Sequence, residues 1–362
     1  MANKLRTAVP TTMRDLAILK IIFIDGTITL PGKSHKAGLV GAAQNDDDPG
    51  QPFTWSMVLT SYPTADFTTH LARQLATDPR RLEWPREFMV TGASGSLPAV
   101  FDPHNALLTI HGARTTDFSG PELHPWLTIG PDTAALCSRV LVYATPGDQQ
   151  KWAGFGFKNE GTIQGYWSAG GAACLWARNQ GERAKGGLEA GPPAPEKLPP
   201  SSASDPRLPA AVVCRVADVD DAMAIGNLLR QVFPHYPIPA DPGVIRYALA
   251  SGQVHGRLIR HAAGSIVSYA SVEFQPGGGS AEITDCVTLP EFRGQGMMTH
   301  LVRRLLEDLD DVFECRHGHS LAREDEPAMQ SVLARCGWLR TGYLVNHFRV
   351  GGDWKSAYLW QA

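Results

Sequence analysis

The sequence predicts an α/β protein with a mixed sheet, built from two related units of which the C-terminal one is complete. Apolar segments of strand length alternate with helical patterns throughout residues 210–362. A shorter alternation of the same kind occupies residues 95–181. Between them, residues 182–209 are rich in Pro, Gly, Ala and Ser and contain almost no bulky apolar side chains. We therefore expect an extended linker between the two units.

The composition points to small-molecule partners. The 362 residues are 43% hydrophobic and 19% charged, which is sufficient for two or three globular domains. The formal charge of -3, from 33 Lys+Arg and 36 Asp+Glu, gives no general attraction to nucleic acid or to an anionic membrane. No apolar run approaches the ~18 residues of a membrane helix, and the six cysteines lack metal-binding or disulfide spacing. We expect a cytoplasmic protein without a metal site; a homodimer is compatible with these features.

The first half of the chain has the weaker patterns. Residues 1–94 are expected to be an N-terminal extension, with a strand at 18–24 and a short helix at 67–75, and the sequence assigns no role to it. In residues 95–181 we expect strands at 106–111, 138–143 and 162–167, with short helices at 132–137 and 148–153. These elements amount to an incomplete, degenerate unit.

Residues 210–362 are expected to form a complete α/β unit. Strands are predicted at 211–216, 254–261, 266–274, 283–289, 313–321, 342–350 and 357–360. Asp218 or Asp220 is expected to cap a helix that extends to about residue 232, and further helices are predicted at 298–309 and 327–335. Two segments, Gly156-Phe157-x-x-x-Gly161 and Gly337-Trp338-x-x-x-Gly342, share one register and indicate an internal repeat. Chance similarity is the alternative.

A strand, a glycine loop and a helix follow one another in residues 282–309. The helix is indicated by one apolar face, formed by Met298, Leu301, Val302, Leu305, Leu306 and Leu309. The first amides of a helix lack intrahelical partners, and the helix dipole adds positive potential there. Gly294 and Gly296 leave the backbone open to a phosphate, and Arg293 adds charge. The pattern predicts a phosphate site; an ordinary surface turn is the alternative.

This loop resembles the acyl-coenzyme A loop of the GNAT acetyltransferase superfamily, [R/Q]-x-x-G-x-[G/A]. Arg293 and Gly296 match the pattern, and Met298 stands where the pattern has Gly or Ala. The resemblance implies acetyl-coenzyme A as co-substrate. It implies cofactor contacts from Val287, Thr288, Leu289, Arg293, Gly294, Gln295, Gly296, Met297 and Met298. The first unit has no counterpart of this loop, so only the C-terminal unit is expected to bind the cofactor.

Further segments resemble the beta-lysine N-acetyltransferases, which act on a small diamino acid. They are Tyr236-Pro-Ile-Pro, Ala281-Glu-x-Thr284-Asp285 and Gly342-x-Leu-Val-Asn346. The resemblance implies a small amine or amino acid as acceptor. The candidate acceptor-binding residues are Tyr236, Tyr269, Glu273, Asn346 and Trp354, and a structural role is the alternative for each of them. His347 stands where a second asparagine is expected in that family, and Leu333 where the superfamily has a tyrosine, so the general acid is unassigned.

Acetyl transfer to an amine requires a group that accepts the amine proton, because a lysine-like ammonium has a pKa near ~10.4. Glu282 is the predicted general base, and Asp285 is predicted to hold the substrate ammonium. An ion-paired or edge carboxylate is the alternative for Glu282, and a structural bond for Asp285. Strand alternation would place Asp285 on the opposite face from Glu282 unless a bulge redirects it. The resemblance further implies that the backbone amides of residues 287–289 polarise the thioester.

Two functions from other classes remain open. Enzymes that transfer an amino acid from aminoacyl-tRNA also pair two units of this kind, but the charge balance does not predict an RNA-binding groove. A module that binds an acyl-coenzyme A or an amino acid without turnover is the other alternative. Met298 and Leu333 are the features in its favour.

Overall fold

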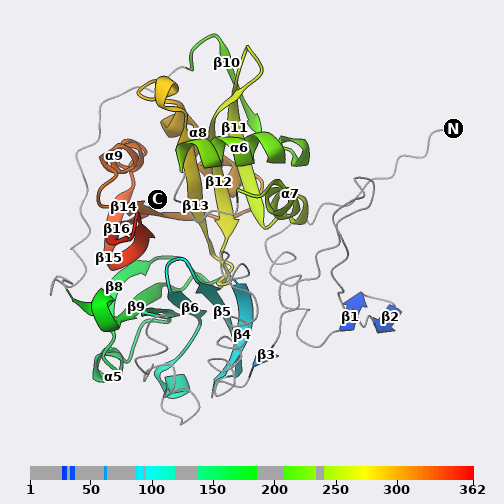
Figure 1. Ribbon diagram of the computed structural model, residues 1–362. Coiled ribbons are helices and arrows are strands. Elements are labelled where there is room, and N and C mark those ends of the chain that lie inside the picture. The colour runs from blue at the N-terminus through cyan, green and yellow to red at the C-terminus, as the bar shows by residue number, and fades with distance from the viewer. Residues whose placement is uncertain are drawn as a thin grey trace.

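The computed structural model describes residues 27–30, 33–36, 61–62, 86–92, 95–118, 137–185, 208–233 and 240–362 (Figure 1). The elements predicted at 18–24 and 67–75, most of the helix predicted at 132–137, and Tyr236 lie outside these residues. The first half contains helix α5 (Gln149–Gly154) and the strands β1 (Thr27–Leu30), β2 (Lys33–Lys36), β3 (Ser61–Tyr62), β4 (Arg86–Gly92), β5 (Gly95–Asp102), β6 (Leu107–His111), β7 (Arg139–Ala144), β8 (Lys158–Ile163) and β9 (Ala173–Asn179).

The described residues of the second half form seven strands and four α-helices. The strands are β10 (Val212–Val216), β11 (Val254–His261), β12 (Ile266–Phe274), β13 (Ser280–Thr288), β14 (His317–Arg323), β15 (Leu339–Val350) and β16 (Asp353–Gln361). The helices are α6 (Ala222–Val232), α7 (Pro242–Ser251), α8 (Met297–Asp311) and α9 (Pro327–Arg335). Most of the strands and helices predicted in residues 210–362 are confirmed to within a few residues.

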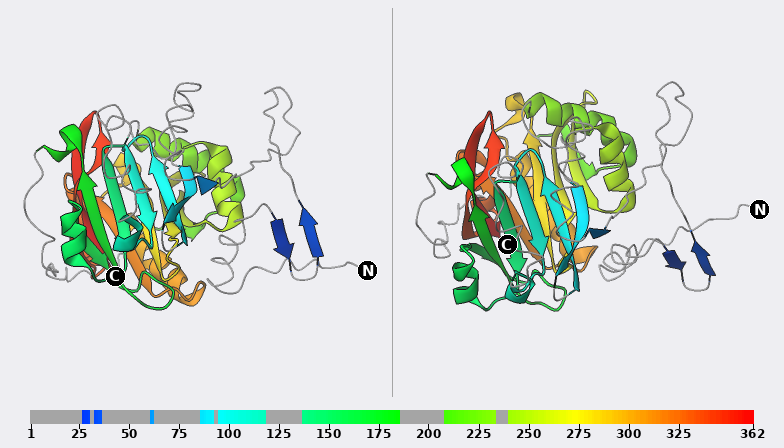
Figure 2. Two further views of the ribbon diagram at one scale, coloured as in Figure 1. Left: turned by 90° about the horizontal axis from the view of Figure 1, so that it is seen from below. Right: turned by 60° about the horizontal axis from the view of Figure 1, so that its bottom comes forward.

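Among the residues that the structure describes, β1 and β2 pair by themselves, and a mixed sheet of 14 strands runs through both halves. Its order is β10-β11-β12-β13-β14-β16-β15-β8-β9-β7-β6-β5-β4-β3. The pairs β13–β14, β6–β7 and β3–β4 are parallel, and the other neighbours are antiparallel. Figure 2 shows strands of the two halves side by side, with β15 and β16 next to β8 and β9. The mixed sheet predicted from the sequence is confirmed.

The two halves repeat one helix ending. Gly156 and Gly337 both have left-handed backbone angles, with φ of 79° and 81°. The amide of Phe157 donates to Trp152 O and the amide of Trp338 donates to Leu333 O, each over 3.1 Å. This hydrogen-bond pattern ends a helix at a left-handed glycine and turns the chain into the next strand. The glycine register noted in the sequence therefore corresponds to one local structure formed twice.

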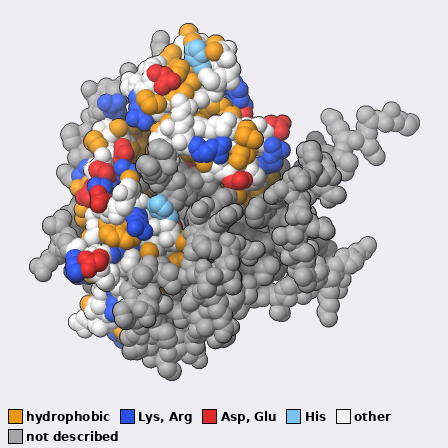
Figure 3. Space-filling model, viewed as in Figure 1, with side chains coloured by type: hydrophobic (Ala, Val, Ile, Leu, Met, Phe, Trp, Pro, Cys, Tyr) orange, Lys and Arg blue, Asp and Glu red, His pale blue; other side chains and the backbone are white. Residues whose placement is uncertain are grey.

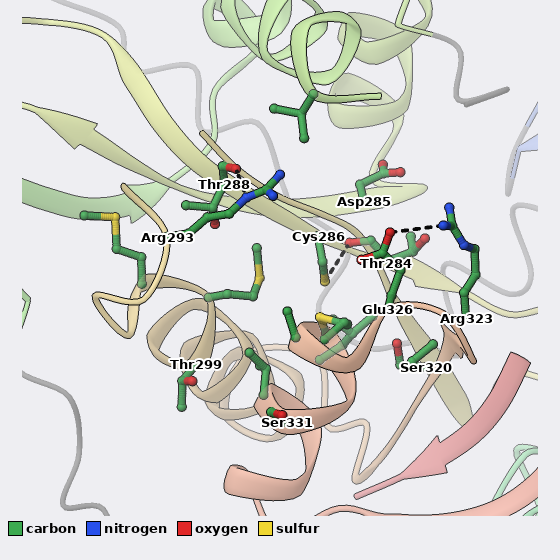
Figure 4. Close-up of a pocket in the computed structure, with 18 of the residues that line it drawn as sticks. Thr284, Asp285, Cys286, Thr288, Arg293, Thr299, Ser320, Arg323, Glu326 and Ser331 are labelled. Carbon is green, nitrogen blue, oxygen red and sulfur yellow. Dashed lines mark hydrogen bonds and ion pairs between the residues drawn. The ribbon is translucent and has the colours of Figure 1, made fainter. Parts of the chain in front are cut away.

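Helix α8 packs on the sheet through its apolar face. Leu301, Val302 and Leu305 are fully buried. A Cβ atom added to Gly318 on β14 would meet Leu306 Cδ2 at 3.0 Å, which shows how closely the helix approaches the strand. Helix α6 lies on the other side of the strands (Figures 1 and 4). Strands β13 and β14 therefore lie between two layers of helices.

One expected strand differs from the structure, and two elements of the structure were not predicted. The strand predicted at 162–167 is β8, which begins at Lys158 and ends at Ile163, because the backbone of Gln164 is held by the side chain of Gln361. Strand β9 was not predicted. Helix α7 was not predicted either, although Asp241 caps it and Pro242 occupies its first turn.

Both predicted unit boundaries in the first half also need correction. The boundary at residues 94–95 falls inside a hairpin, because β4 pairs with β5 along its length, from Arg86↔Phe101 to Gly92↔Gly95. The boundary predicted at residue 182 is wrong as well, since Arg183 is 1% exposed and is packed into the fold. Its guanidinium donates to the carbonyl oxygens of Asn105 and His347, over 2.6 Å each, and so ties the end of the first half to β15.

Candidate active site

Strands β13 and β14 separate at the centre of the second half. They pair in parallel at Ser280↔His317, Ala281↔Gly318 and Glu282↔His319. No further pair joins them within the described residues, although β13 continues to Thr288 and β14 to Arg323. The two strands therefore form a V that opens directly beyond Glu282.

A cavity of about 730 Å³ fills this opening (Figure 4). Strand β13, the loop before α8, helix α8, strand β14, helix α9 and the end of α6 all contribute to its wall. The lining residues include Thr284, Asp285, Cys286, Thr288, Arg293, Gly294, Gly296, Met297, Met298, Ser320, Arg323, Met329 and Val332. A cavity of this size accommodates a ligand of the size of a nucleotide or drug.

The glycine loop forms one end of the cavity. Gly294 and Gly296 both have φ of 76°, a backbone conformation that glycine adopts without strain. A Cβ atom on Gly294 would meet nothing within 4 Å, so the backbone here faces open space. Gly296 is the N-cap of the 15-residue helix α8, and no side chain caps this end. The loop and the uncapped helix end fit a diphosphate group.

Most of the predicted cofactor-binding residues line the cavity, namely Thr288, Arg293, Gly294, Gly296, Met297 and Met298. Leu289 requires a correction, because its amide donates to Val267 O over 2.9 Å and its side chain is buried. In an antiparallel pair, the backbone N–H and C=O groups of successive residues point alternately toward the partner strand and away from it. Because Leu289 bonds to β12, the backbone groups of its neighbour Thr288 point away from β12, toward the opening. Val287 is buried in the core, and Gln295 is exposed beside Glu291.

A β-bulge brings the two predicted catalytic carboxylates to one face of β13. The register with β12 shifts between Tyr269 and Ser271, opposite Asp285, whose φ is 52°. Ser271 pairs with Thr284, which lies two residues after Glu282 and therefore faces the same side. The hydroxyl of Ser271 donates to Asp285 Oδ2 over 3.0 Å. Asp285 thus faces the same side as Glu282, and strand alternation without a bulge would have separated them.

Both carboxylates hold their protons more tightly than usual. Removal of Glu282 from water, followed by the negative charge of Asp285, raises the pKa of Glu282 from 4.5 to about 7. Burial raises the pKa of Asp285 to about 6, against the hydrogen bond from Ser271. Asp285 lines the cavity, whereas Glu282 lies at the last strand pair before it. A carboxyl group with a pKa near neutrality suits proton transfer at physiological pH.

The predicted acceptor residues are dispersed. Tyr269 is 2% exposed and belongs to the core of the second half. Glu273 is exposed on β12, where it pairs with Glu282. Asn346 Nδ2 donates to Arg183 O over 2.9 Å, at the junction of the two halves. Leu333, at the position of the superfamily's tyrosine, is fully buried. None of these four side chains lines the described cavity.

Sequence reasoning missed the far wall of the cavity. Ser320 and Arg323 on β14 lie across the opening from Arg293 of the glycine loop (Figure 4), and Met329 and Val332 on α9 also line the cavity. Cys286, which follows the bulge, also lines the cavity. The sequence did predict α9, with proline at its first position, but its periodicity could not show which side of the helix faces the opening.

Fold and site together define the second half of the chain as an α/β domain with a cavity that can hold a phosphate-bearing ligand. The model of the acetyltransferase (GNAT) family matches residues 224–338, so these residues form a GNAT acetyltransferase domain. The match covers α6 to the start of β15, including the bulge, the loop and the V between β13 and β14. The superfamily resemblance predicted from the loop is confirmed.

Named relatives agree with this family. The chain is 34% identical over 155 residues to a beta-lysine N(6)-acetyltransferase of Methanosarcina mazei. The aligned region covers 42% of this chain and 56% of that protein. It is 29% identical over 229 residues to the N-acetyltransferase YodP of Bacillus subtilis, which covers 61% of this chain and 81% of YodP. The match therefore spans little more than half of the Methanosarcina mazei enzyme.

Solved structures of acetyltransferases overlap with part of the chain. A spermidine N-acetyltransferase of Vibrio cholerae in complex with CoA and spermine has 16% sequence identity and a TM-score of 0.37. The overlap covers 42% of this chain and 96% of that chain. At this TM-score the likeness adds nothing to the family assignment.

Other kinds of site are not found in the described part of the chain. No three His, Cys, Asp or Glu side chains are grouped to hold a metal ion there. All six cysteines are free thiols. No described helix has the length and apolar character needed to cross a bilayer. On the face in Figure 3, basic and acidic side chains of the described residues are interspersed and are not segregated by sign.

Proposed function

We propose that this protein is an acetyl-coenzyme A-dependent N-acetyltransferase for the amine of a small amino acid or diamine similar to beta-lysine. The proposal depends mainly on the position of Glu282. This residue has a raised pKa and belongs to the last residue pair that joins β13 to β14 before the two strands separate. The cavity with its glycine loop begins directly beyond this pair. The GNAT match and the similarity to the Methanosarcina mazei enzyme support the same reaction class.

Acetyl-coenzyme A supplies the acetyl group as a thioester. Gly294, Gly296 and the first amides of α8 hold its diphosphate, and Arg293 adds a positive charge at the rim. The open backbone amide of Thr288 donates to the thioester oxygen, which strengthens the polarisation of the carbonyl as charge develops. The opening between the strands then directs the acetyl group toward Glu282.

Glu282 accepts a proton from the substrate ammonium, which leaves a neutral amine. The amine nitrogen forms a bond to the acetyl carbon, the carbon–sulfur bond breaks, and the sulfur leaves as a thiolate. The nitrogen then loses a second proton, which protonates the thiolate to give the free thiol of coenzyme A. A carboxylate with a pKa of about 7 is a stronger base than an ordinary glutamate and is still ionised in part at neutral pH. The raised pKa therefore supports the role of Glu282 as general base.

Asp285 gives the site a second negative charge on the same face. An acceptor with two ammonium groups places one beside Glu282, for reaction, and the other beside Asp285. Binding of a cation also lowers the cost of ionising both carboxyls. This pair favours a diamine or diamino acid over a monoamine of the same length.

The test is thiol release from acetyl-coenzyme A with a panel of beta-lysine, lysine, spermidine and monoamines. We expect release with diamines and loss of release in Glu282→Gln. Release with no amine, or undiminished release by Glu282→Gln, would overturn the proposal. Product that depends on aminoacyl-tRNA would instead support a ligase, and acetyl-coenzyme A binding without turnover would support a binding module.

We also propose that residues 95–181, extended by β4, form a second, degenerate unit of the same topology. In each half a parallel pair, β6–β7 or β13–β14, precedes a short helix and a final hairpin, β8–β9 or β15–β16. The repeated helix ending at Gly156 and Gly337 supports this relationship. Residues 186–207 then connect the units, and the cofactor binds only to the second one.

A further inference from the structure

A short loop of the first half, residues 164–168, packs beside the start of the strand that carries Glu282, and we name it the docking loop. It lies between β8 and β9 and packs against residues 275–279, the turn that joins β12 to β13. Ser168 N donates to Gly277 O over 2.8 Å, and Gly279 N donates to Tyr166 O over 2.9 Å. Trp167 and Gly278 form a β-bridge between the two segments. The contact thus ends one residue before β13 begins.

The fit between the docking loop and β13–β14 leaves no space. A Cβ atom on Gly279 would lie 2.3 Å from Gly165 O, and one on Gly277 would lie 2.3 Å from Tyr166 Cε1. A Cβ atom on Gly165 would lie 2.0 Å from His317 Cδ2, on the first residue of β14. Glycine at these positions permits an approach that any side chain would prevent.

The side chain of Tyr166, in the docking loop, extends the contact to the residue that pairs with Glu282. The ring of Tyr166 lies 6.4 Å from that of His319, the strand partner of Glu282. Tyr166 is fully buried, and His111 Nδ1 lies 2.6 Å from its hydroxyl oxygen. Tyr143 packs against the same ring with 5.1 Å between centroids. The first half therefore forms a rigid wall behind the paired start of β13 and β14.

We propose that the docking loop, through Gly165 and Tyr166, is a positioning element for Glu282, holding β13 and β14 together up to the pair at which they separate. This inference rests on the proposed role of Glu282 as general base. The inference assigns a function to the first half of the chain, which has no counterpart of the cofactor loop. The docking loop makes no contact with the substrates; it fixes the carboxylate that does.

The wall also covers part of Glu282, whose side chain is half-buried. The titratable groups on the elements packed around its side chain are Asp285 and Cys286 on β13, Glu273 on β12, His317 and His319 on β14, Tyr143 on β7 and Tyr166 in the docking loop. Burial lowers the pKa of His319 to about 3, so this histidine is neutral at physiological pH. Removal from water is the main cause of the raised pKa of Glu282, and the negative charge of Asp285 is the second, so better access of water to Glu282 should lower this pKa.

The test uses two glycines of the same connection between β8 and β9. Gly165→Ala drives a methyl group into His317, whereas Gly170→Ala meets nothing within 4 Å. Both positions have positive φ, 65° and 86°, so both variants carry comparable backbone strain. A difference between them reports on the contact with β14.

We expect Gly165→Ala to lower kcat about 10- to 100-fold, as displacement of a catalytic group by about 1 Å does. The dissociation constant for acetyl-coenzyme A should not change, and the acid limb of kcat/KM should move to lower pH because water gains better access to Glu282. Gly170→Ala should keep the wild-type kcat and pH profile. Equal kinetics in the two variants, or loss of acetyl-coenzyme A binding in step with kcat in Gly165→Ala, would overturn the inference.

Tyr166→Leu provides a second test if Gly165→Ala does not fold. It removes the ring that lies 6.4 Å from the ring of His319 and replaces it with a smaller apolar side chain. We expect a lower kcat and a displaced acid limb with unchanged acetyl-coenzyme A binding; a wild-type pH profile would contradict the inference. A wild-type protein that acetylates no amine, or a fully active Glu282→Gln, would instead overturn the proposed function itself.

Discussion

Gly161 and Gly342 face each other across the single backbone pair that joins β8 to β15. A Cβ atom on Gly342 would lie 2.5 Å from Glu160 O and 2.7 Å from Gly161 Cα. The two glycines occupy equivalent places in the repeated motif, five residues after the left-handed glycines at 156 and 337. The repeat therefore places a side-chain-free position on each strand where the two halves meet.

The first prediction concerns this junction. Gly342→Ala should destabilise the protein by at least ~1–3 kcal/mol, because the added methyl group overlaps backbone atoms that have no room to move. Urea denaturation followed by circular dichroism measures the effect. Gly154→Ala is the matched control, since a Cβ atom there meets nothing within 4 Å and alanine favours the helix. Equal stability of the two variants would contradict close packing at the junction.

The second prediction concerns the general base. In the wild type, kcat/KM should rise with pH through about 7, because Glu282 acts when it has lost its proton. Glu282→Gln should lower kcat by ~10²–10⁴-fold and remove this inflection. Glu307→Gln, on the exposed face of α8, removes the same charge and should leave the profile intact. If the pH profile of Glu282→Gln kept the inflection near pH 7, the inflection would belong to another titrating group.

The third prediction concerns the neighbour of that base. Asp285→Asn removes a negative charge that raises the pKa of Glu282. The acid limb of kcat/KM should therefore move to lower pH, while KM for a diamine should rise because the second ammonium loses its partner. Rate profiles with a diamine and a monoamine separate the two effects. An acid limb that moves to higher pH would show that Asp285 does not act on Glu282 through its charge.

The fourth prediction concerns the cofactor loop. Gly294→Ala places a methyl group in the open space at the loop, at a backbone angle that costs an L-residue about 1–2 kcal/mol. KM for acetyl-coenzyme A should rise about tenfold or more, which corresponds to at least ~1.4 kcal/mol of binding free energy. Gly264→Ala has the same kind of strain, with φ of 97° and open space, in the turn between β11 and β12. It should lose stability without a change in KM.

The fifth prediction concerns Asp308 on α8. Burial alone would raise its pKa, but hydrogen bonds from Arg257 and His255, at 2.5 to 2.7 Å, hold the pKa at about 2. Asp308→Asn leaves Arg257 without its charge partner and should cost ~3–5 kcal/mol of unfolding free energy at pH 7. The exposed pair Arg304–Glu307 serves for comparison, and Glu307→Gln should cost at most ~1 kcal/mol.

The pH dependence of this effect has a definite sign. The folded-state pKa of Asp308 lies below its ordinary value of 3.8, so its contribution is complete above that value. It is lost as the pH falls toward 2, where the carboxyl of the wild type is protonated. The stability difference between wild type and Asp308→Asn should therefore shrink between pH 5 and pH 2 in urea titrations. A constant difference would mean that the ionised form of Asp308 is not what stabilises the fold.

The sequence was most informative where structure is local. The helix from Met297 follows from a periodic apolar face, and the loop before it from glycines at fixed spacing. The bulge at Asp285 was anticipated only as an alternative to regular alternation, because no residue type at that position signals it. Its cause is the register with β12, where Ser271 receives Asp285.

Contacts between distant segments account for what the sequence missed. Gln164 is held by Gln361, which is 197 residues further along the chain, and this contact ends β8 early. Arg183 appears in a Pro- and Gly-rich segment, yet five backbone and side-chain acceptors from both halves bury its charge. Patterns of composition report the average character of a segment and cannot reveal a single buried anchor within it.

The continuous sheet has a practical consequence for work with fragments. A fragment cut between residues 185 and 208 would expose the edge of β8 in one piece and of β15 in the other. Unprotected strand edges recruit one another, so each piece would tend to self-associate or precipitate during expression. Attempts to obtain the acetyltransferase domain alone are best made with β15 shielded, by added charges on its edge or by co-expression of the missing half.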